Sequence, residues 1–234
     1  MSQVWRLVAA FGLVCRVAEA SVQCSRVEIE SIPLEKLMPE TSTTAGLLQH
    51  EHAKPSTDHT LTICAIIIVA AILSNTLHEG VGHGLTALLT GAKSGILTTV
   101  AWSSAFDSRL VEAGGTLVNL AAALLFWLVL RSAKNAVMPM RYFLLITCAF
   151  NLFSGTGYFF FSGVTNFGDW AAVISGLNPH WLWRMLLVVG GAAAYYAAVR
   201  VVGIGLVRYV GVPRDQQKRM RKLTILPYFS AIVL

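Results

Sequence analysis

Charged residues are scarce in this chain. Asp, Glu, Lys and Arg make up 13% of its 234 residues, whereas 55% are hydrophobic; a soluble globular domain has about 25% charged residues. This composition excludes an ordinary soluble domain and favours an integral, multi-pass membrane protein. The formal net charge of +6 does not indicate nucleic acid, because the basic residues lie mainly at the ends of apolar runs and after Tyr209. We therefore expect a lipid bilayer as partner and no nucleic acid.

Cysteine is also scarce. The four cysteines, Cys15, Cys24, Cys64 and Cys148, include no pair at CxxC spacing. This excludes a disulfide framework and a cysteine-rich metal site. A bridge between Cys15 and Cys24 would require that end of the chain to be exported and retained.

The first 58 residues lack a sustained apolar period. Residues 1–20 resemble a secretory signal, with Arg6 before an apolar stretch, but Arg16 interrupts the expected order, so a signal or anchor and a short amphipathic segment both remain open. Residues 21–58 read as a flexible polar arm, and its histidines as solvated. The sequence thus divides into this signal-like start and arm (1–58), a membrane domain (59–209) and a basic tail with an apolar end (210–234).

Four apolar runs are long enough to span a bilayer, which needs about 20 residues of helix. They begin near Thr60, Gly115, Tyr142 and Trp181. We therefore predict an all-α polytopic membrane protein with about four transmembrane helices. Residues 95–102 are rich in β-branched side chains and predict a small hairpin or loop between the first two helices.

Polar residues and glycines occur in the third run and after it. Asn151, Gly155 and Gly157 are expected to interrupt that helix, and residues 162–170 predict a broken or re-entrant segment. The basic loop before this run and the basic tail are both expected in the cytoplasm. With four spans the amino end would then be cytoplasmic too, so either the signal-like start is not cleaved as a signal, or an extra or re-entrant segment lies within residues 61–112.

The densest group of ionisable residues is His78-Glu79-Gly80-Val81-Gly82-His83 at the end of the first run. Such residues at membrane depth are functional by default. In zinc helices of H-E-x-x-H type the histidines are four residues apart and share a face, with Glu as base. Here they are five apart, so on a regular α-helix they diverge by about 140°.

Two arrangements solve this mismatch. In one, a π-bulge absorbs the extra residue and brings both histidines to one metal, which leaves Glu79 free to activate water; the nearby glycines permit this distortion. In the other, the helix stays regular, Glu79 and His83 share a face and His78 lies apart. We favour the bulge, while a hydrogen-bonded cluster or a proton relay without metal remains an alternative.

Three segments together resemble the site-2 protease family of intramembrane zinc metalloproteases: residues 75–91 with the histidines, residues 113–120 with Gly114, Gly115 and Asn119, and Asn166-Phe167-Gly168-Asp169. The resemblance covers about residues 60–175. It implies zinc bound by His78, His83 and Asp169, with Glu79 as general acid and base in hydrolysing peptide bonds of membrane-embedded substrates. This chain departs from the family in its extra residue between the histidines and in the glycine that precedes Asp169.

The sequence thus predicts a zinc-dependent intramembrane endopeptidase acting on a transmembrane protein substrate, with Asn119 and Asn151 as candidate positioning groups. A catalytically inactive membrane scaffold that keeps the fold is one alternative. A small ion- or proton-coupled transporter that uses His78, Glu79 and Asp169 is another.

Overall fold

The computed structural model describes residues 59–98, 101–105, 108–210 and 216–233. Expectations for the signal-like start, the polar arm and their cysteines and histidines up to residue 58 lie outside the described residues. The elements in chain order are α2 (Thr60–Thr76), a π-helical turn η2 (Leu77–Leu85), α3 (Thr86–Thr90), β1 (Ile96–Leu97), β2 (Trp102–Ser103), α4 (Arg109–Ser132), α5 (Met138–Thr165), α6 (Asp169–Val173), α7 (His180–Val210) and α8 (Gln216–Val233).

Within the described part of the chain, four helical segments are long and apolar enough to cross a membrane: Thr60–Thr90, Arg109–Ser132, Met138–Thr165 and His180–Val207. The first comprises α2, η2 and α3 in one continuous helical run. By length and composition this confirms the expected all-α architecture with four spans, and it indicates a membrane-embedded, multi-pass protein.

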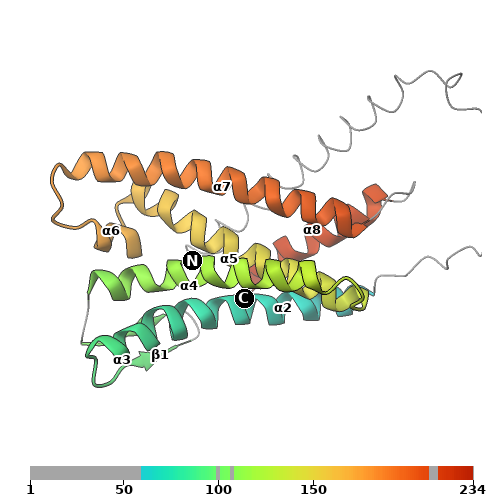
Figure 1. The fold of residues 1–234 in the computed structure, drawn as a ribbon, viewed down its shortest axis with the longest axis horizontal. Coiled ribbons are helices and arrows are strands. Elements are labelled where there is room, and N and C mark those ends of the chain that lie inside the picture. The colour runs from blue at the N-terminus through green and yellow to red at the C-terminus, as the bar shows by residue number, and fades with distance from the viewer. Residues whose placement is uncertain (1–58, 99–100, 106–107, 211–215, 234) are drawn as a thin grey trace, which may run out of the picture.

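Helix α5 is the central element of the bundle. In its most apolar stretch 72% of residues are buried, against 22% in the first and last spans, so those two leave most of their apolar surface outward. Figure 1 shows α5 between α7 and α4. Helices α2, α4 and α7 all contact α5.

An apolar core joins α2, α5, α7 and α8. Ile67 of α2, Phe150 of α5, Val199 of α7 and Leu223 of α8 are each at most 1% exposed. The Tyr142 hydroxyl also donates to the carbonyl of Leu223 at 3.0 Å. The helix formed by the basic tail therefore packs back onto the bundle.

The opposite end of the bundle carries the short elements (Figure 1). Strands β1 and β2 pair antiparallel, with Ile96 opposite Ser103 and Leu97 opposite Trp102, which confirms the expected hairpin. Both strands contact η2, and α6 contacts α4 and α5. This end therefore brings segments that are distant in sequence to the histidine turn.

Two helix boundaries differ from the sequence-based expectation. The polar and glycine residues from Asn151 to Gly157 do not interrupt α5, which continues to Thr165 and is followed by the short helix α6; buried against neighbouring helices, these small residues serve as packing positions. Helix α4 begins at Arg109 rather than Gly115, because Ser108 caps it by accepting a hydrogen bond from the Val111 amide.

Candidate metal centre

The histidine stretch adopts π-helical geometry over the nine residues of η2. A π-turn pairs residues five apart, so it places His78 and His83 on one face. The predicted bulge is therefore confirmed, and the regular-helix alternative, in which His78 lies apart from His83, is wrong. Both rings are almost fully buried, at 2% and 8% exposure.

Glycine on two helices allows η2 to pack directly against α4. A methyl group at Gly82 would lie 2.4 Å from the Gly115 Cα, so no side chain fits at this position. A methyl group at Gly115 would lie 2.5 Å from His83 Nε2 and 2.6 Å from His78 Nε2. Gly115 therefore keeps open the space that the two imidazole nitrogens occupy.

The orientation of His83 is fixed by α4. Its Nδ1 lies 2.7 Å from the Val111 carbonyl oxygen. Because a carbonyl can only accept, the proton sits on Nδ1, and the Nε2 lone pair is available to a metal. His78 is held differently: its ring stacks on Tyr158 of α5 at 4.8 Å and meets the His83 ring edge to face at 4.9 Å.

Asp169 reaches the histidines from the start of α6, directly after the loop that follows α5. Asn166 ends α5 in the left-handed region, at φ 54°, and Gly168 follows at φ 87°, ψ −173°, which only glycine adopts readily. The glycine before the aspartate thus makes the turn that aims Asp169. The His180 ring bonds the Asn166 side chain at 3.0 Å, and Arg184 donates to carbonyls at the end of α5.

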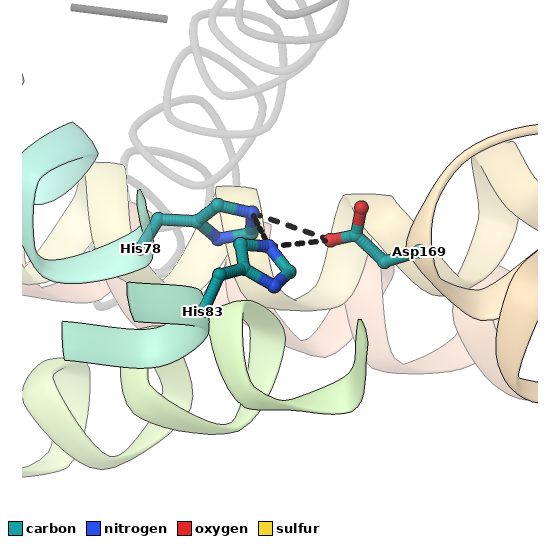
Figure 2. A group of neighbouring side chains, drawn as sticks. All are labelled: His78, His83 and Asp169. Atoms are coloured by element: carbon teal, nitrogen blue, oxygen red, sulfur yellow. Dashed lines mark hydrogen bonds and ion pairs between the residues drawn. The ribbon is translucent and has the colours of Figure 1, made fainter. Parts of the chain in front are cut away.

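The three candidate ligand atoms converge (Figure 2). His78 Nε2 lies 3.2 Å from His83 Nε2 and 3.2 Å from Asp169 Oδ2, and His83 Nε2 lies 3.5 Å from that same oxygen. Ligands of a tetrahedral metal at about 2.0–2.1 Å are about 3.3–3.4 Å apart. The triangle therefore has the size of one face of a tetrahedron, and this group can hold a metal ion.

The charge of the group also suits a cation. Burial alone would raise the pKa of Asp169, but the adjacent His78 and His83 lower it, by hydrogen bonding and by charge, to about 2. Asp169 is therefore ionised at neutral pH. A carboxylate and two imidazole lone pairs directed at one point repel one another unless protons or a metal ion lie between them.

Glu79 is placed by the hairpin. It is 6% exposed, and its Oε2 accepts a hydrogen bond from the Trp102 amide at 2.9 Å. The Trp102 ring in turn packs where side chains at Gly84 and Gly95 would otherwise lie. The hairpin therefore fixes the orientation of this carboxylate, which the sequence did not indicate because the donor is a backbone amide.

Asn119 and Asn151, the candidate positioning groups, lie in the protein interior at 1% and 0% exposure. Sequence reasoning did not assign roles to Val111 and Tyr158, which hold the two imidazole rings. The sequence signal for Tyr158 is its position on α5, three residues after Gly155, whereas a carbonyl acceptor such as Val111 leaves no signal in the sequence.

No protein-family model, curated protein or solved structure matches this chain.

Proposed function

We propose that this protein is an intramembrane zinc metalloprotease that hydrolyses peptide bonds of membrane-embedded substrates. The observation that carries the proposal is the convergence of His78 Nε2, His83 Nε2 and Asp169 Oδ2 at 3.2–3.5 Å. Two imidazoles and one carboxylate are a ligand set of catalytic zinc sites, which leave the fourth position for water or substrate. The resemblance to site-2 proteases in residues 60–175 supports the same assignment.

Four residues have distinct roles in this mechanism. His78, His83 and Asp169 hold the ion, which when bound polarises a scissile carbonyl and lowers the pKa of water. Glu79 lies next to His78 on the same π-turn and serves as the group that takes a proton from water and passes it to the leaving amine. The bond from the Trp102 amide holds the Glu79 carboxylate in one orientation, which is what a positioned base requires.

Cleavage by purified protein tests this assignment. Zinc-loaded wild type in detergent or vesicles is incubated with candidate transmembrane peptides and compared with Glu79→Gln. Loss of a general acid and base typically costs about 10²- to 10⁴-fold in rate, so we expect turnover to fall by that factor while zinc content is unchanged. Equal rates for the two proteins would remove Glu79 from the mechanism.

One observation favours a second candidate, a metal-binding scaffold without turnover. Glu79 is almost fully buried and already has a backbone hydrogen bond at its Oε2, an arrangement that also suits a structural carboxylate tying the hairpin to η2. This reading predicts bound zinc, no cleavage by wild type, and a lower unfolding temperature for Glu79→Gln because the bond to Trp102 is weakened.

A further inference from the structure

Several fully buried polar atoms lie beside the candidate metal centre without a partner. Among the described residues, none forms a hydrogen bond with His78 Nδ1, Thr116 Oγ1, Asn119 Oδ1 or Asn151 Oδ1. All four side chains are at most 2% exposed. Buried polar atoms are almost always hydrogen-bonded, to protein or to ordered water, so each of these four requires an explanation.

His78 packs on α4 one helical turn from Asn119. The two elements run antiparallel: Gly82 packs on Gly115, and His83, one residue later, bonds the carbonyl of Val111, four residues earlier on α4. The His78 imidazole lies against Gly115, since a methyl group there would meet its Cε1 and Nε2 at 2.6 Å. Asn119 is one helical turn further along the same face of α4, as residue i+4 from Gly115.

Asn119 and Asn151 lie at the same level of the α4–α5 interface. Two contacts bracket them: the Cys148 thiol reaches the Ala123 carbonyl at 3.3 Å, and a methyl group at Gly155 would lie 3.4 Å from the Thr116 carbonyl. One asparagine lies between the two contacts on each helix. The four orphan atoms therefore belong to one junction of η2, α4 and α5.

Their hydrogen-bonding roles are complementary. With Nε2 of His78 directed at a metal, its Nδ1 carries the proton and donates, and the Thr116 hydroxyl can donate as well; the two amide oxygens only accept. One water molecule accepts two hydrogen bonds and donates two, so it can satisfy all four atoms, and buried waters typically make two to four such bonds.

We propose that a single buried water at this junction links His78 Nδ1 to Thr116, Asn119 and Asn151, and that Asn119 is thereby a positioning residue for the metal ligand His78. The inference rests on the proposed metal site. Metal-binding histidines almost always donate their second N–H to a fixed acceptor. His83 uses the Val111 carbonyl, and the water supplies the corresponding acceptor for His78.

The zinc affinity of the full-length protein in detergent tests the proposal, measured by competition with a chromophoric chelator. Loss of such an outer hydrogen bond typically costs about 10- to 100-fold in metal affinity. We expect that loss in Asn119→Leu, Asn151→Leu and Thr116→Val, of which the last is nearly isosteric and least disturbs folding. Asn119→Asp keeps an oxygen acceptor and is expected to retain the wild-type affinity or exceed it.

Thr147→Val is the matched control. Thr147 is as fully buried as Thr116, but its hydroxyl donates to the Phe143 carbonyl within its own helix at 2.8 Å. Its replacement should leave zinc affinity unchanged. If wild type, Asn119→Leu and Thr116→Val bind zinc with equal affinity, the water link is wrong but the metal site is unaffected. If Thr147→Val loses as much zinc affinity as Thr116→Val, the loss reflects interhelical packing alone, and the water link is again wrong. A wild-type protein that binds no zinc overturns the proposed function and this inference together.

Discussion

The two ends of the helix bundle are held together by different means. At one end, large apolar side chains such as Ile67, Phe150 and Leu223 fill the space between α2, α5 and α8. At the other end, glycines bring η2 and α4 into backbone contact, and the space they open is occupied by His78 and His83. The apolar end is stabilised by close packing of large side chains. The metal end has fewer large side chains in contact, and its glycines instead let polar groups lie at fixed distances.

This contrast explains why the helix distorts at one end only. Helix α2 is regular as far as Thr76, and the π-helical turn begins at Leu77, immediately before the first histidine. A π-turn is costly and persists where the surroundings determine it, which is most often at functional sites. Here the contact of Gly82 with α4 and the bond from His83 to Val111 supply that constraint.

Filling the glycine space should have the largest effect on the metal end. In Gly115→Ala the new methyl group would lie within 2.6 Å of the nitrogens of both histidines, so the ligands are displaced and we expect zinc binding to be lost. Metal analysis after dialysis measures this. Gly190→Ala on α7 is the control, because a methyl group there meets no atom within 4 Å; loss of zinc in both variants would contradict the account.

Removing packed volume from the other end should affect stability rather than metal affinity. Ile67→Ala deletes a side chain that is fully buried and is expected to lower the free energy of unfolding by about 2–5 kcal/mol. Zinc affinity of the folded protein should not change.

The adjacent residue provides the control for this variant. Ile68 is 37% exposed, so Ile68→Ala should cost much less in a denaturant titration in detergent. A similar loss in both variants would show that the apolar end is not packed as described.

The smallest effect is expected at the end of α5, next to the loop that leads to Asp169. Arg184→Gln removes hydrogen bonds to the carbonyls of Gly163 and Val164 at the end of α5. A cation at a helix C-terminus contributes about 0.3–1 kcal/mol, and we expect a loss of that size in thermal unfolding. Arg200→Gln on the same helix, whose guanidinium bonds only the Tyr196 hydroxyl among the contacts described for it, should have less effect; the reverse order would refute this role of Arg184.

The sequence predicted the apolar framework well because hydrophobic runs of sufficient length admit few other structures in a bilayer. It was less reliable at element boundaries. Capped by Ser108, α4 begins at Arg109, six residues before the Gly115 start that the apolar run predicted. Gly155 and Gly157 were expected to break α5, but within the bundle they allow neighbouring side chains to approach and the helix continues.

The candidate site was predictable only to the extent that its chemistry resides in side chains. Counting five residues from His78 to His83 led to the requirement for a π-turn, and the structure has it. The partners of these residues were not predictable, because the Val111 carbonyl and the Trp102 amide are backbone groups that any residue supplies. The orientation of Asp169 likewise depends on the backbone conformation of Gly168. A glycine in the sequence allows that conformation but does not show that it is adopted.

Metal analysis of the purified full-length protein tests the central claim most directly. We predict about one zinc per chain, the stoichiometry of a site with three protein ligands, and its loss in His83→Ala and in Asp169→Asn. His180→Ala is the control, because that side chain is only partly buried and bonds only the Asn166 side chain among its described contacts. Wild-type protein that stays metal-free after exposure to zinc, or zinc retained in both ligand variants, would contradict the claim that His78, His83 and Asp169 form a metal centre.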